Sequence, residues 1–153
     1  MGLGLVPLHD AITAHVQATL PNTPVREDTF PDDETPPRDA NQQVIPYIIL
    51  RYGPLRKSYG TGEALAGARH DNYFGTVDVM AVAPQGRMAR RVFDILTDCL
   101  IGFNPGGGGS ITLEGSASNF VVTSNEARPT QNVCMIRMKF PVNAVSVGVP
   151  LTP

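Results

Sequence analysis

The chain has 153 residues, a length typical of one domain. Its 12 lysines and arginines against 14 aspartates and glutamates give a formal net charge of -2, which excludes a whole-molecule basic field for non-specific nucleic-acid or membrane binding. A chain of this length can bury about 68–70% of its unfolded surface, so it needs no disulfide or metal to fold. Residues 2–8 are too short and uncharged to be a signal peptide, and no apolar run approaches ~18 residues, so we expect a soluble protein.

A first amphipathic helix is predicted over residues 7–20, because apolar side chains recur there every four positions, at Leu8, Ile12, Val16 and Leu20. Residues 21–43 then alternate prolines with carboxylates and offer little to bury. Such a segment cannot offset its ordering entropy, so we expect an extended acidic loop that is solvated or faces a basic neighbour. Its spacing does not fit a calcium loop of the EF-hand type.

Two strands, at residues 44–52 and 73–82, are predicted to form a long hairpin. The first is apolar on both faces, so both faces of the sheet are expected to be covered there. In the second strand, Val77, Val79 and Ala81 point to one face, opposite Thr76, Asp78 and Met80. The connection over residues 53–72 is a long glycine-rich arm. Because loops beyond ~12–15 residues are uncommon in small domains, this arm favours a role in contact with other proteins.

The clearest helix is predicted over residues 87–101, with Gly102 as a left-handed cap. Its expected buried stripe is Met88, Val92, Ile95, Leu96, Cys99 and Leu100, and its expected outer face is Arg87, Arg90, Arg91, Asp94 and Asp98. The glycines at 106–109 lack the lysine and following helix of a phosphate loop, so a flexible connection is expected.

Three further strands are expected at residues 110–114, 120–124 and 133–142. The last alternates Cys134, Ile136, Met138 and Phe140 with Arg137 and Lys139. The predicted fold is therefore α+β, an antiparallel sheet of about four strands with two helices on one face and a long hairpin arm.

No catalytic, cofactor or metal site can be nominated from the spacing of residues. His9 and His15 do not share a helix face, and we expect them to be isolated surface or partner-contacting residues. Cys99 and Cys134 lie in apolar patterns, which favours reduced core thiols, although a disulfide stays open. No Ser-His-Asp or Cys-His set is apparent, so we expect no enzymatic activity.

The candidate functional residues are contact residues. We expect the arm to meet a neighbouring subunit or another protein through Arg56, Lys57, Tyr59, Arg69 and His70. A second set, Arg87, Arg90 and Arg91 on the main helix, is a candidate for contact with a neighbour or with a central channel.

Three stretches of the chain together give a characteristic order of helices and strands and one short sequence motif. The first is the helix of residues 8–20, with the acidic passage leading to the apolar strand at 46–50. The second is the strand 75–82 that enters the helix of residues 88–100. The third is Leu100-Ile101-Gly102-Phe103-Asn104-Pro105, followed by glycines and a strand at 111–115. Over about residues 5–142 the chain thereby resembles the tail terminator, or tail completion, proteins of long-tailed bacteriophages.

This resemblance implies one domain over residues 1–153 that forms a ring of identical copies, typically a hexamer, at the head–tail joint of the virion. The ring would be assembled in the host cytoplasm, dock on the major tail tube protein, stop tube growth and meet the head–tail connector proteins. DNA would pass through its lumen without sequence-specific binding, and no membrane or cofactor is implied.

Two other functions stay open. A head-closure or adaptor protein of the connector shares this size and these arms, and differs by its position in the joint. A small-molecule-binding or hydrolytic α+β domain would require a pocket with convergent polar groups.

Overall fold

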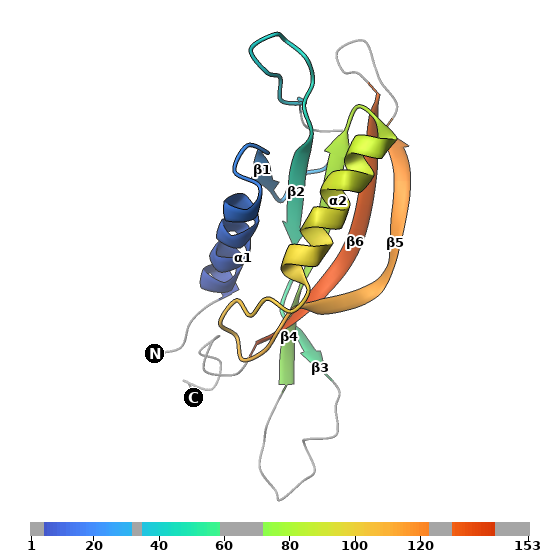
Figure 1. Cartoon of the computed structure of the whole chain (residues 1–153). Coiled ribbons are helices and arrows are strands. Elements are labelled where there is room, and N and C mark those ends of the chain that lie inside the picture. The colour runs from blue at the N-terminus through green and yellow to red at the C-terminus, as the bar shows by residue number, and fades with distance from the viewer. Residues whose placement is uncertain (1–4, 32–34, 59–71, 123–129, 143–153) are drawn as a thin grey trace, which may run out of the picture.

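The computed structural model describes residues 5–31, 35–58, 72–122 and 130–142. Within them, two helices pack on one face of a six-stranded sheet (Figure 1). The helices are α1 (Leu5–Thr19) and α2 (Gly86–Leu100). The strands are β1 (Val25–Glu27), β2 (Tyr47–Tyr52), β3 (Arg56–Ser58), β4 (Asn72–Ala83), β5 (Thr112–Val122) and β6 (Gln131–Val142). The predicted α+β class, with both helices on one face, is confirmed.

The strand order is β1-β2-β4-β6-β5, with β3 pairing to the beginning of β4. Neighbouring strands are antiparallel except β1, which runs parallel to β2. The predicted antiparallel sheet of about four strands therefore corresponds to β2, β4, β6 and β5. The parallel edge strand β1 lies inside the segment predicted to be an acidic loop, and for those three residues the prediction was wrong.

The acidic segment is also ordered by a local turn near residue 40. Asp39 accepts hydrogen bonds through Oδ1 from the backbone N–H of Asn41 at 2.8 Å and of Gln43 at 2.9 Å. Arg38 and Val44 then form an isolated antiparallel bridge. Aspartate commonly closes turns in this way, so residues 38–44 adopt a defined turn although they have little to bury.

The predicted hairpin is present, and its register sets Tyr47 opposite Val82 and Tyr52 opposite Val77. Its arm begins later than expected, because β3 continues the pairing along β4 after a short interruption. Pro54, which has no N–H to donate, lies in that interruption. Gly53 precedes it, and a Cβ there would lie 2.2 Å from Oγ1 of Thr76, so a larger residue would have to displace that hydroxyl.

The stripe of α1 is confirmed, with Leu8, Ile12 and Val16 buried and Leu20 partly buried against the same core. On α2, Leu96 and Leu100 are buried, but Ile95, predicted in the stripe, is 40% exposed. Ile95 lies about 100° around the helix from Leu96, at the margin of the face that packs on the sheet. Phe93, which the sequence analysis left out, is partly buried there instead.

The strands predicted at 110–114 and 120–124 are one strand, β5, with an irregularity between Glu114 and Ser118. Gly115 lies there with a φ of 91°, a conformation that suits glycine. The pattern on either side of this bulge shifts register, and for that reason it resembles two short strands.

In the glycine run before β5, Gly107 is buried and Gly109 is half-buried, so the prediction of a flexible connection was wrong for these two positions. A Cβ on Gly107 would lie 2.4 Å from the carbonyl oxygen of Pro141, and one on Gly109 would lie 2.5 Å from Cγ of the same proline. Gly107 also approaches Leu8 of α1. The absence of side chains lets this loop close against both β6 and α1. At the end of α2, Gly102 has the predicted left-handed conformation, with a φ of 88°.

The two faces of the sheet differ. The helix-covered face holds the main core, which includes Ile48, Leu50, Val77, Val79 and Met138. The other face has a smaller apolar cluster of Tyr47, Ile49, Met80, Val82 and Val133. The prediction that the β2 strand is covered on both faces is confirmed, since all four of its first residues are buried.

Candidate interaction surfaces

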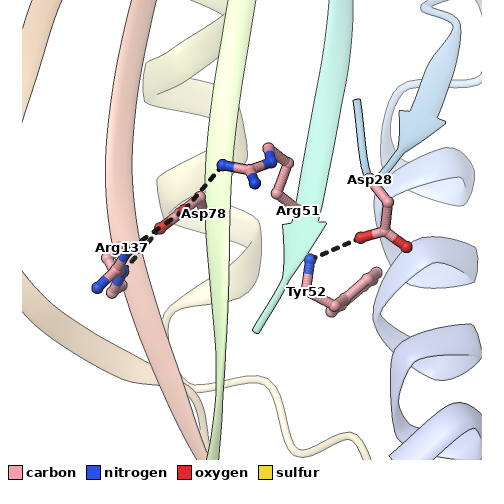
Figure 2. Close-up of polar contacts among 5 residues, drawn as sticks. All are labelled: Asp28, Arg51, Tyr52, Asp78 and Arg137. Atoms are coloured by element: carbon pink, nitrogen blue, oxygen red, sulfur yellow. Dashed lines mark hydrogen bonds and ion pairs between the residues drawn. The ribbon is translucent and has the colours of Figure 1, made fainter. Parts of the chain in front are cut away.

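A row of alternating charges crosses the sheet on the face away from the helices (Figure 2). Register places Arg51 of β2, Asp78 of β4, Arg137 of β6 and Glu114 of β5 side by side. Nε of Arg137 donates to Oδ1 of Asp78 at 2.8 Å, and Nη1 of Arg51 lies 3.8 Å from Oδ2. Each pair of opposite charges at directly facing positions stabilises a sheet by about 0.2–1 kcal/mol, so the row helps to fix the strand register.

Two features extend this row beyond Asp78. The guanidinium of Arg51 stacks on the ring of Phe30, with Cζ 3.7 Å from the ring centroid. Oε2 of Glu114 is buried without a hydrogen-bond partner at the far end. The row is thus a structural element of the sheet, with two cationic and two anionic side chains in alternation.

A polar cluster joins α1 to the sheet beside β1. The rings of His9 and Tyr52 stack at 4.0 Å, and the Tyr52 hydroxyl donates to the carbonyl oxygen of His9 at 3.0 Å. Thr13 lies 2.8 Å from that hydroxyl and donates to Glu27 at 2.5 Å. Asp28 accepts the backbone N–H of Tyr52 at 3.0 Å, as Figure 2 shows. The cluster anchors the helix to β2.

Burial lowers the pKa of His9 below its ordinary value, although Asp28, Glu27 and Asp10 act in the opposite direction. Burial also raises the pKa of Tyr52 well above the usual range for a phenol. Both side chains are therefore neutral at pH 7.

His15 connects α1 to the end of α2. Its ring stacks on Phe103 at 3.9 Å, and its Nε2 lies 2.9 Å from the carbonyl oxygen of Cys99, which accepts the hydrogen bond. Of the two alternatives predicted for His9 and His15, isolated surface residues or contacts to a partner, the first was wrong, since both are half-buried contacts between elements of this chain. A side chain that stacks across elements leaves no periodic signal in the sequence.

The two cysteines are free thiols. Cys134 is buried and Cys99 is half-buried, in agreement with the core prediction. Burial raises the pKa of both thiols, which disfavours the reactive thiolate.

The base of the arm is the pair β3 and β4, which projects beyond the helix-covered part of the sheet (Figure 1). Arg56 is exposed on β3, in register with Phe74. Lys57 follows it in the strand. The other predicted contact residues, Tyr59, Arg69 and His70, lie outside the described residues.

The second predicted set lies on the first half of α2, where Arg87, Arg90 and Arg91 are all exposed. Arg90 differs from the others because it borders a half-open hollow between α2 and the β5 edge. This hollow is lined by Gly86, Asn119, Phe120, Val121, Asn132 and Val133, among others. The sequence predicted the exposure of these arginines but gave no signal for the hollow, which depends on the distance between α2 and β5.

Within the described part of the chain, no group of three or more histidine, cysteine, aspartate or glutamate side chains could hold a metal ion. None of the helices described is long and apolar enough to cross a membrane.

Comparisons with known proteins leave the family open. No family model and no curated protein matches the chain. One solved structure, of a protein whose name states no function, is similar over 93% of this chain and 97% of its own, with 18% sequence identity and a TM-score of 0.46. A similarity of this size says nothing about function.

Proposed function

We propose that this chain is a structural protein of the tail of a long-tailed bacteriophage. Copies of it form a ring that caps the tail tube, ends tube growth and presents the surface that joins the head connector. DNA passes through the centre of the ring. The protein acts by contact with itself and with its neighbours in the particle, and it carries out no chemical step.

One observation carries the proposal, namely the hairpin extension made by β3 and β4. The pairs Arg56 with Phe74 and Ser58 with Asn72 extend the sheet past the part that the helices cover (Figure 1). This pairing holds Ser58 and Asn72, the two ends of the connection, side by side at the end of the sheet. An arm of this kind suits contact with a second protein better than it suits the stability of its own domain.

The remainder of the domain supports a rigid platform for such an arm. The arm strand β4 pairs along its length with β6, from Tyr73 with Val142 to Ala83 with Asn132. The charged row around Asp78 ties the same strands together. Displacement of the arm tip by a partner would therefore be transmitted to a strand that is fixed on both sides.

The test is a deletion of the arm tip that preserves its base. Because Ser58 and Asn72 face each other in register, replacement of residues 59–71 by Asn-Gly would close the hairpin with a two-residue turn. We expect the shortened protein to fold with a melting temperature close to that of the intact chain, since its core is unchanged. We also expect it to lose capping, so that tubes of abnormal length accumulate.

A matched control replaces the same tip by an equally long glycine-serine segment, which retains the length but removes the side chains. Loss of capping in both variants would assign the contacts to the side chains of the arm. Normal tails and infectious particles from the Asn-Gly variant would contradict the proposed role of the arm.

A further inference from the structure

The two lateral sides of the domain carry different exposed groups at opposite ends of the sheet. On one side, Val6 of α1 is 64% exposed. On the other, at the β5 edge, Phe120 is 40% and Val121 is 54% exposed. Figure 1 shows α1 beside β1 and, across the sheet, β5 at the opposite edge. Two different apolar surfaces at opposite ends are what head-to-tail association of identical copies requires.

The composition of both sides supports burial in an interface. Helix α1 has one charged residue, Asp10, in its 15 residues, and β5 has one, Glu114, in its 11 residues. A solvent-exposed edge strand is usually protected by lysines, prolines or a bulge; β5 has no lysine or proline, and its bulge lies between Glu114 and Ser118, before Phe120 and Val121. Depletion of charge is a property of the buried centre of protein interfaces.

The hollow beside β5 offers a specific receptor for α1. The side chain of Val121, which alternates with that of Phe120 on β5, belongs to the face that α2 covers and contributes to the apolar lining, and Arg90 stands at the border of the hollow close to Gly86. Among the described residues Arg90 has no ion-pair partner. On α1, Val6 and Asp10 are one turn apart on the exposed surface, so an aliphatic side chain and a carboxylate project together.

From this complementarity we infer that the first turns of α1 in one copy dock on the hollow at the β5 edge of the next copy. Val6 enters the apolar part of the hollow, and Asp10 pairs with Arg90 of its neighbour. This contact would be the subunit interface of the proposed ring. Only the number of copies in the ring rests on the proposed function. The partner is a second copy of this chain.

A charge exchange tests the interface in solution. Association of the full-length protein is followed by sedimentation up to about 1 mM, where an interface of about 4 kcal/mol is already half occupied. We expect Asp10→Arg and Arg90→Glu each to lower the association constant by about tenfold or more, because each variant alone sets like charges face to face. A 1:1 mixture of the two variants recovers association to within about threefold, because every contact then joins opposite charges.

Two controls accompany the exchange. Asp98→Arg makes the same charge change at an exposed position on α2 and is expected to leave association unchanged. Val6→Ser should weaken association, but the 1:1 mixture of the two charge variants should still recover association when both carry this substitution. Thermal melting of each variant verifies that the monomer is folded, which we expect because all these positions are exposed.

A wild-type chain that remains monomeric at about 1 mM would overturn the inference. So would single variants that associate normally, or a mixture that shows no recovery. The outcome is separable from the proposed function. If the chain lies at the head–tail joint but its association does not respond to the charge exchange, the interface is rejected and the proposed function stands. If the exchange works but the chain is absent from tails, the interface stands and the proposed function is rejected.

Discussion

Leu96 and Ile95 are adjacent on α2 but occupy opposite environments. Leu96 is fully buried against the sheet, while Ile95 is 40% exposed. Leu96→Asp would place an unpaired carboxylate in the main core, which costs more than a domain stability of about 5–15 kcal/mol can readily absorb. We expect that variant to fail to fold, and Ile95→Asp to change the free energy of unfolding by less than about 1 kcal/mol.

Circular dichroism and thermal melting of the two variants decide this prediction. Arg90→Ala, at an exposed position of the same helix, should stay within about 0.5 kcal/mol of the wild type. A mild Leu96→Asp together with a damaging Arg90→Ala would mean that the buried and exposed faces of α2 are reversed.

His9 makes the stability of the fold depend on pH. Because burial lowers its pKa in the folded state, the unfolded chain binds the proton more readily near pH 6.5 and below. Above about pH 6.5 the His9 ring is neutral in both states and its contribution to stability is fully present. The free energy of unfolding then declines as the pH falls from about 6.5 toward the lower pKa that His9 has in the folded protein.

The substitution His9→Phe separates this contribution from the titration of the carboxylates. Phenylalanine retains a ring to stack on Tyr52 but takes up no proton. We expect the melting temperature of the variant to fall less than that of the wild type between pH 7 and pH 5. Equal slopes in both proteins would show that His9 does not titrate against folding.

At the scale of elements, the sequence predicted the helices and strands whose apolar residues recur at a regular interval. The stripe of Leu8, Ile12 and Val16 predicted α1, and the alternation in residues 133–142 predicted β6, because a helix face and a strand face repeat at fixed intervals. The hairpin of β2 and β4 followed from two apolar runs joined by a glycine-rich connection.

Other elements depend on contacts between distant segments, and these gave no local signal. β1 is three residues long and is held by its parallel pairing to Ile48, Ile49 and Leu50. The glycine run appeared flexible because the closeness of Pro141 depends on where β6 lies. For the candidate site, the exposure of Arg90 was predictable, but the hollow beside it follows from the packing of α2 on β4 and β6, which leaves β5 at its other side.

The packed glycine run can be tested by one methyl group. A Cβ on Gly107 would lie 2.4 Å from the backbone oxygen of Pro141, so the loop or β6 must shift. We expect Gly107→Ala to destabilise the fold by about 1–3 kcal/mol, the usual cost of overpacking.

The control is Gly86→Ala at the beginning of α2. Its nearest atom would be the end of the flexible Arg90 side chain, at 3.1 Å, and alanine favours the helix. The free energy of unfolding, measured with urea, should change by less than about 1 kcal/mol in this variant. A Gly107→Ala variant as stable as the wild type would indicate that the loop is not packed as described.

At the scale of the whole molecule, the fold combines a rigid two-layer body, one hairpin extension and two unlike lateral edges. The body is fixed by its core and by the charged row, whereas the extension and the edges present groups that the domain itself does not use. In the proposed ring of copies, the edges would close the ring and the extension would be available to a neighbouring protein of the particle.

The most direct test of this account is an electron cryo-microscopy reconstruction of tailed particles that contain the chain. The account predicts a closed ring of copies, six in the form that the resemblance implies, seated between the last ring of the tail tube and the head connector. It also predicts α1 of each copy against the β5 edge of the next. A single copy, or a location outside the head–tail joint, would contradict it.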